Sequence, residues 1–172
     1  MKLAIDGRAV ELPEGATVLD GVNRLGIPLP QLCKDPDCAP LGACRTCLVH
    51  VEGQKGLPAA CHLPARDGMV VSTEHPDAVR VRRGVLDLTI AMSEDGRGRG
   101  QAATHAITHG LGISTYAPAP RAPRDESNIF FTLNMADCIL CGRCVDACQR
   151  TQHIGAIGVN GRGSTARIGV AF

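Results

Sequence analysis

Short alternating runs of hydrophobic and polar residues occupy the first 75 positions, with one stretch of helical spacing between them. Positions 2–5 and 8–12 alternate, and the Asp6-Gly7 pair between them is typical of a two-residue hairpin turn. Thr17 can cap a helix whose apolar residues recur every three or four positions until Gly26. Positions 48–51 and 69–72 are the next apolar runs, so residues 1–75 are predicted to form an α+β domain with one helix on a mixed sheet.

The pattern changes between residues 76 and 128. Helical spacing of apolar residues predicts a helix from Pro76 to about Met92. Beyond it, the Gly-rich stretch 96–100 predicts flexible chain, and the Pro-rich stretch 117–123 predicts a stiff, extended spacer. A short helix fits residues 102–109 between these stretches. Residues 76–128 are therefore predicted to be a helix followed by a linker.

Residues 129–172 are predicted to be a second small folded module. Residues 129–133 form an apolar run that predicts a strand, and a cysteine-dense loop and helix follow it. Between residues 154 and 170, apolar residues alternate around Gly-rich turns, which predicts further short strands.

Composition points to a small core and a reducing environment. The 172 residues include no Trp, one Tyr and three Phe, so something besides core mass is expected to help hold the fold together. The nine cysteines are an odd number and no apolar signal segment begins the chain, which favours reduced thiols in the cytoplasm. The net charge of +1 argues against nucleic-acid binding, and the absence of an apolar run of about 18 residues argues against membrane insertion.

Four cysteines in the first domain have the spacing of a metal site. Gaps of ten, two and thirteen residues separate Cys33, Cys44, Cys47 and Cys61. Thiolates suit both zinc and iron-sulfur clusters, so the spacing alone leaves both open. The small residues around Gly42 favour a cluster loop, because inorganic sulfides accept hydrogen bonds from backbone N–H groups that approach closely. Cys38 is an additional thiol that can replace Cys33 in this spacing.

Two stretches of the first domain resemble a known family. They are CKDPDCAPLGACRTCLVHVEG and the later AACHLP. They are similar to the 2Fe-2S domain of the large iron-sulfur subunit of respiratory NADH dehydrogenase, and still more to the α subunit of NAD-dependent molybdenum formate dehydrogenases. Asp67 to Val71 and Asp125 to Phe131 extend the resemblance in the same order. It implies a β-grasp, ferredoxin-like fold for residues 1–75. It also implies a 2Fe-2S cluster held by Cys33, Cys44, Cys47 and Cys61 rather than by Cys38.

A second cysteine set has the spacing of bacterial ferredoxins. Cys138, Cys141, Cys144 and Cys148 form the run Cys-x2-Cys-x2-Cys-x3-Cys, which predicts a 4Fe-4S cluster. In this arrangement the first three thiolates hold one cluster and the fourth is directed to another, so Cys148 is expected to face a second cluster. No cysteine follows Cys148. We therefore expect a partial ferredoxin-like module with an incomplete ligand set. The chain is then a fragment of a longer subunit, or a partner completes the site, or the site has three ligands.

The sequence departs from the resembling family between the two cysteine sets. That family commonly carries a further 4Fe-4S site there with one His and three Cys ligands, but this chain has no cysteine between Cys61 and Cys138, so that cluster cannot form. His105 and His109 are four residues apart, and two histidines without a third ligand are better interpreted as solvated residues.

These features predict an electron carrier with no catalytic centre of its own. The resemblance implies that electrons pass from formate, oxidised at a molybdenum-cofactor domain or subunit, to a flavin subunit that reduces NAD. One alternative is an electron-transfer subunit of an NAD-reducing hydrogenase or NADH dehydrogenase. An alternative of another class is a zinc-stabilised binding module, which would be colourless where an iron-sulfur protein is brown.

Overall fold

The computed structural model describes residues 1–118, 124–130 and 132–170. The chain forms two compact units, and their boundary lies within one helix, between Val85 and Leu86. The first unit comprises residues 1–34 and 39–85, and the second comprises residues 35–38 and 86–172.

A four-stranded mixed sheet forms the first unit, in the order β2-β1-β4-β3. Its strands are β1 (Lys2–Ile5), β2 (Arg8–Glu11), β3 (His50–Val51) and β4 (Val70–Ser72). β1 pairs antiparallel with β2 and parallel with β4, which in turn pairs antiparallel with β3. The predicted mixed sheet is therefore confirmed, and together with its single packed helix it is the β-grasp, ferredoxin-like arrangement of an α+β fold.

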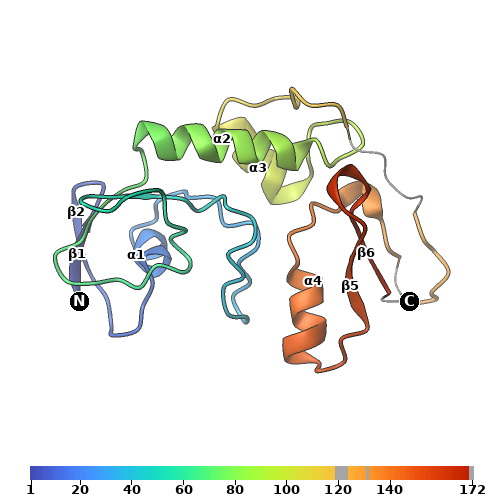
Figure 1. Ribbon diagram of the computed structural model, residues 1–172, viewed down its shortest axis with the longest axis horizontal. Helices are drawn as coiled ribbons and strands as arrows, with labels where there is room; N and C mark the ends of the chain where they lie inside the picture. The colour runs from blue at the N-terminus through green and yellow to red at the C-terminus, as the bar shows by residue number, and fades with distance from the viewer. Residues whose placement is uncertain (119–123, 131, 171–172) are drawn as a thin grey trace. The chain divides into compact units, whose positions relative to one another are not determined.

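Local sequence signals account for the hairpin and the helix. Asp6 and Gly7 both have positive φ, as a tight hairpin turn between right-twisted strands requires. Thr17 forms a capping box with Asp20 at the start of α1 (Val18–Arg24), as the sequence predicts. Figure 1 shows α1 beside β1 and β2, and Val18, Leu19 and Val22 are buried on the side that joins the core.

The core of the first unit reaches the cysteine loop. Aliphatic side chains from the sheet and α1 form one buried cluster, and this cluster includes the side chains of Cys47 and Cys61. Ile5, Val18, Val22 and Val49 have no exposed surface. The core therefore contacts directly two of the residues that the sequence selects as metal ligands.

Helix α2 (Pro76–Ile90) confirms the predicted helix, but the flexible chain predicted after it is wrong. Residues 93–99 form an ordered turn, and α3 (Gly100–Thr108) follows it. Gly96 and Gly98 are buried and have positive φ, and the Gly98 amide donates to Ser93 Oγ at 2.7 Å. The carboxylate of Asp87 in α2 accepts from the amide and the hydroxyl of Thr115 at 2.9 and 2.6 Å, which ties the chain after α3 to α2. Residues 119–123 of the predicted spacer lie outside the described residues.

The cysteine-rich part of the second unit consists of short elements. They are η1 (Met135–Asp137), α4 (Arg143–Asp146), the π turn η2 (Ala147–Thr151), β5 (Ile157–Asn160), η3 (Gly163–Thr165) and β6 (Arg167–Val170). β5 and β6 confirm the predicted short strands; they pair as an antiparallel hairpin, and Figure 1 shows this hairpin beside α4.

The strand predicted for residues 129–133 is wrong for the part of that range the structure describes. Ile129 and Phe130 lie in a bend and are each 88% exposed. The chain instead turns back, so that Asp125 and Leu133 form an isolated bridge. In the described part of the chain, no helix has both the length and the apolar character needed to cross a membrane.

Candidate metal centres

The four cysteines of the first set come together in the first unit. The long loop between α1 and β3 carries Cys33, Cys44 and Cys47, and the turn after β3 carries Cys61. Cys33, Cys47 and Cys61 are each 2% exposed, and Cys44 is half-buried. The residue before Cys61 is tied to Cys47, because the amide of Ala60 donates to the Cys47 carbonyl at 2.9 Å.

The four thiols approach one another as two hydrogen-bonded pairs. The Cys33 thiol bonds to Cys44, which lowers the pKa of Cys44 to about 5 and raises that of Cys33. The Cys61 thiol bonds to Cys47, which lowers the pKa of Cys47 to about 7 and raises that of Cys61. The charges of Cys33 and Cys44 also raise the pKa of Cys61, so the two pairs lie within electrostatic range of each other.

Backbone and hydroxyl groups of the loop face these sulfur atoms. The amide of Cys44 donates to Cys33 Sγ at 3.5 Å, and Thr46 Oγ1 lies 3.1 Å from Cys44 Sγ. Gly42 has a φ of +66°, and a Cβ at this position would lie 2.6 Å from the His62 ring. The loop therefore needs glycine at position 42 for its backbone conformation and for its close approach to His62.

Two pairs of buried thiols fit a binuclear iron-sulfur cluster, in which two cysteines bind each iron. Within the described residues, no three His, Cys, Asp or Glu side chains surround one point closely enough to hold a single metal ion. The donor chemistry fits as well, because sulfur atoms already facing backbone N–H and hydroxyl groups suit a cluster whose potential depends on such bonds.

The additional thiol of the loop is not a member of these pairs. Cys38 belongs to the second compact unit, and its Sγ is 3.8 Å from Thr151 Oγ1. Nearby, Arg143 Nη2 donates to Asp35 Oδ2 at 2.5 Å. This placement supports Cys33 over Cys38 as the ligand.

The second cysteine set is more exposed than the first. Burial raises the pKa of the Cys144 thiol, and the charges of Cys141 and Cys138 raise it further, so these three lie near one another. Cys148 lies in η2, and its Sγ accepts from the amide of Ala156 at 3.3 Å. The grouping of Cys138, Cys141 and Cys144 supports a three-thiol cluster site.

Two ion pairs hold the polypeptide within the second set and directly before it. Asp146 lies between Cys144 and Cys148, is 5% exposed, and pairs with Arg150 at 2.7 Å. Before the set, Arg99 Nε lies 3.4 Å from the carboxylate of Asp137, which immediately precedes Cys138. Sequence reasoning missed these two contacts, because neither pair belongs to a metal-binding motif.

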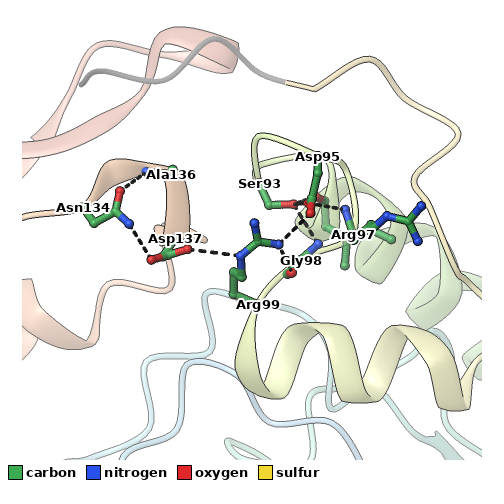
Figure 2. A network of polar contacts seen from close by, with 9 residues as sticks. Ser93, Asp95, Arg97, Gly98, Arg99, Asn134, Ala136 and Asp137 are labelled. Atoms are coloured by element: carbon green, nitrogen blue, oxygen red, sulfur yellow. Dashed lines mark hydrogen bonds and ion pairs between the residues drawn. The ribbon is translucent and has the colours of Figure 1, made fainter. Parts of the chain in front are cut away.

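A polar network occupies the segment between the two cysteine sets. Figure 2 shows Asp95 between Ser93, the Arg97 amide and the Arg99 guanidinium, with Arg99 continuing to Asp137. Ser93 Oγ also donates to the carbonyl of Ile90 at 2.7 Å. Where the resembling family places a further cluster, this chain has a turn closed by hydrogen bonds and an ion pair.

His105 and His109 lie on α3 and at its end. His109 Nδ1 lies 2.9 Å from the carbonyl of His105. Burial lowers the pKa of His105, and the neighbouring His109 lowers it further. The ring of His109 thus contacts the backbone carbonyl of His105 and not its ring. Among the described residues, no third side chain joins these two histidines to form a metal site.

Comparison with known protein families agrees with this geometry. The family described as "2Fe-2S iron-sulfur cluster binding domain" matches residues 1–76. The family described as "4Fe-4S binding domain" matches residues 131–150. The four thiols of the first set and all four cysteines of the second fall within these matches, and the zinc-module alternative is thereby set aside.

Relatives match nearly the whole chain. One of the component proteins of the NADH-quinone oxidoreductase of Rhizobium meliloti is 32% identical over 95% of this chain and 20% of its own length. "NADP-reducing hydrogenase subunit HndD" of Solidesulfovibrio fructosivorans is 30% identical over 100% of this chain and 32% of its own length. The chain thus spans only a fifth to a third of the length of these curated relatives.

A solved structure matches as well. A chain in the "Crystal structure of NAD+-reducing [NiFe]-hydrogenase in the H2-reduced state" is 29% identical, with a TM-score of 0.83 over 99% of this chain and 74% of that one. None of these three relatives is a molybdenum formate dehydrogenase, the enzyme that the sequence resemblance implies. The coarser conclusion holds: this is an iron-sulfur protein that binds 2Fe-2S and 4Fe-4S clusters, related to the N-terminal iron-sulfur region of the large subunits of NADH-quinone oxidoreductases and of NAD-reducing hydrogenase subunits.

Proposed function

We propose that this chain passes single electrons between a substrate-oxidising centre and an NAD-reducing flavin subunit in a cytoplasmic complex. The observation that carries this proposal is the convergence of four thiols, three of them buried, in two pairs, followed along the same chain by a ferredoxin-type cysteine run. The clusters supply one-electron redox chemistry, and the polypeptide supplies ligation, burial and hydrogen bonds.

We assign Cys33, Cys44, Cys47 and Cys61 to the 2Fe-2S cluster. By their pairing, Cys33 and Cys44 would bind one iron, and Cys47 and Cys61 the other. Cys138, Cys141 and Cys144 would hold the 4Fe-4S cluster, with Cys148 directed to a neighbouring cluster. The corresponding domains are residues 1–75 and 129–172.

Spectroscopy of cysteine variants tests the ligand assignment. Anaerobically reconstituted protein should be brown and, on reduction, give a 2Fe-2S electron paramagnetic resonance signal at low potential, roughly −400 mV if it behaves like plant-type ferredoxins. Cys33→Ser should abolish or distort this signal. Cys38→Ser is the matched control from the same loop and should leave it intact. Loss of the signal in Cys38→Ser with retention in Cys33→Ser would reverse the assignment.

The electron donor distinguishes two forms of the proposal. The sequence resemblance favours formate oxidised at a molybdenum centre, whereas the relatives named "NADP-reducing hydrogenase" and "NAD+-reducing [NiFe]-hydrogenase" favour a hydrogenase or NADH dehydrogenase partner. The chain should be purified from its native host with its associated subunits. Bleaching of the brown colour by formate or by H2 then distinguishes formate from hydrogen as the donor, and copurifying molybdenum supports the first form. Bleaching by NADH is expected in both forms, because electrons can also enter through the flavin subunit.

A further inference from the structure

Arg82 is an arginine with a buried head group. It lies on α2 with 2% of its side chain exposed. Nη1 donates to the carbonyl of Leu48 at 3.2 Å, and Nη2 donates to the carbonyl of Thr73 at 2.6 Å. Nε has no partner among the described residues. Arginine is almost never buried this deeply unless its charge has a use or a partner.

The carbonyl that binds Arg82 belongs to the residue after a proposed cluster ligand. Leu48 follows Cys47 directly, and both residues are part of the buried core. Burial lowers the pKa of Arg82, and the charges of Glu74, of Asp6 and, least, of Cys47 oppose this effect. Arg82 is thus a cation held by a hydrogen bond to the residue that follows Cys47.

Two acidic residues lie near Arg82. Glu74 lies 3.9 Å away but is 78% exposed, so solvent screens its charge. Asp6 accepts two hydrogen bonds from Thr73, at 2.7 Å from the amide and 2.6 Å from the hydroxyl, and keeps its negative charge. Burial keeps the pKa of Arg82 lowered although both carboxylates raise it, so the positive charge of Arg82 is only partly balanced.

We propose that Arg82 is a positioning residue of the 2Fe-2S site that also raises its reduction potential. The proposal rests on the cluster assignment made above. The two hydrogen bonds of Arg82 connect α2 to Leu48, in the segment between Cys47 and β3, and to Thr73, directly after β4. When the cluster gains an electron it gains a negative charge, and a nearby cation in a medium of low dielectric favours that reduced form.

Redox titration of charge-matched variants of the reconstituted full chain tests this role. Arg82→Gln should make cluster reduction about tenfold less favourable, which is 59 mV for a one-electron couple. Arg82→Lys keeps a positive charge and should recover at least half of that shift. Arg83→Gln removes an exposed charge from the same helix and should change the equilibrium less than twofold, at low ionic strength.

The outcomes separate electrostatics from packing. A potential unchanged in Arg82→Gln, or shifted equally in Arg82→Lys and Arg82→Gln, would overturn the proposal. If Arg82→Gln does not hold a cluster, Arg82→Lys decides, because it keeps the positive charge while altering the hydrogen bonds. Its potential should fall by no more than half of the expected shift, about 30 mV, and a larger fall counts against the proposal. Failure of the cluster assignment itself would appear differently, as a 2Fe-2S signal unaffected by Cys33→Ser.

Discussion

Cys33, Cys47 and Cys61 in the first unit are each 2% exposed, whereas the cysteines of the second set are half-buried or, at Cys144, exposed. The first set borders a core of aliphatic side chains from a sheet and a capped helix. The second set is carried by helical turns of three, four and five residues and lies next to a two-stranded hairpin. Both sets use thiolate ligands, so the difference lies in what holds the ligands in place.

This contrast indicates two ways of building a cluster site. In the first unit, we expect packing to position Cys47 and Cys61 before iron arrives, because both belong to the buried core, and we expect the loop that leads from residue 30 to Cys47 to depend most on the metal. In the second unit, short elements gain much of their order from the cluster itself, because metal binding is coupled to folding. Ligands held by a packed supporting structure bind more persistently than ligands on loose segments.

Iron loss under chelation is the largest effect that this contrast predicts. In the reconstituted 172-residue chain, a chelator should remove iron from the second site at least about tenfold faster than from the first, because an exposed site with three grouped thiols is easier to attack. The second site should pass through a 3Fe-4S species. Iron counting with electron paramagnetic resonance at each time point measures both rates. Equal rates, or a stable four-iron cluster that disappears in Cys148→Ser, would contradict the division of the second set.

Overpacking the first core is the next largest effect. In Gly21→Ala the new Cβ would lie 2.8 Å from Ile5 Cδ1, so the side chain of a fully buried strand residue must shift. Overpacking costs about 1–3 kcal/mol, which outweighs the helix propensity gained by alanine, about 1 kcal/mol.

Gly84→Ala is the matched control for this substitution. It lies on α2 with nothing within 4 Å of the new Cβ, so it should raise the thermal midpoint slightly while Gly21→Ala lowers it. A lower midpoint in both variants would show that the helices, and not the core contact with Ile5, respond to the change.

Strain in the cluster loop gives a smaller effect. Gly42 and Gly56 both have positive φ, which costs about 1–2 kcal/mol for alanine, but only at Gly42 would the new Cβ meet the His62 ring. Gly42→Ala should therefore lower the occupancy of the 2Fe-2S cluster, whereas Gly56→Ala should leave it unchanged. The absorbance of the reconstituted proteins per mole of polypeptide measures this. His62→Ala added to Gly42→Ala should restore part of the occupancy, and no recovery would show that backbone strain acts alone.

Local signals predicted the elements whose contacts are local. The hairpin, the Thr17 cap, α2 and the strands β5 and β6 follow from turn residues, capping residues and hydrophobic periodicity, and the structure confirms them. The apolar run at Ile129 and Phe130 was misleading, because its β propensity has no neighbouring strand to pair with in the described structure. The Gly-rich stretch after α2 was also misleading, since its order comes from Ser93 and Asp95 side chains that composition does not reveal.

The cysteine sets illustrate the same limit. Spacing and family resemblance selected the cysteines, but the pairing of Cys33 with Cys44 and of Cys47 with Cys61 required coordinates. Arg82 was not predicted, because Arg80 and Arg83 surround it on a helix where arginine is ordinarily exposed. Only the fold places its guanidinium against the carbonyl of Leu48.

The smallest predicted effect concerns the turn that occupies the segment between the cysteine sets. The hydrogen bond from Arg99 and that from the Arg97 amide lower the pKa of Asp95 to about 2 from an ordinary 3.8. Because the folded pKa is the lower one, the contribution of this carboxylate to stability is fully present above pH 4 and is lost only as the pH falls through about 2.

Asp95→Asn reproduces the uncharged state at neutral pH, where the clusters survive. It should increase hydrogen exchange at the amides of Arg97 and Gly98 by roughly two- to fivefold, because the turn opens locally more often. Glu94→Gln is the control, since it removes one neighbouring negative charge and no hydrogen bond of the turn. An equal increase in both variants would mean that net charge near Arg99, and not the Asp95 contacts, keeps the turn closed.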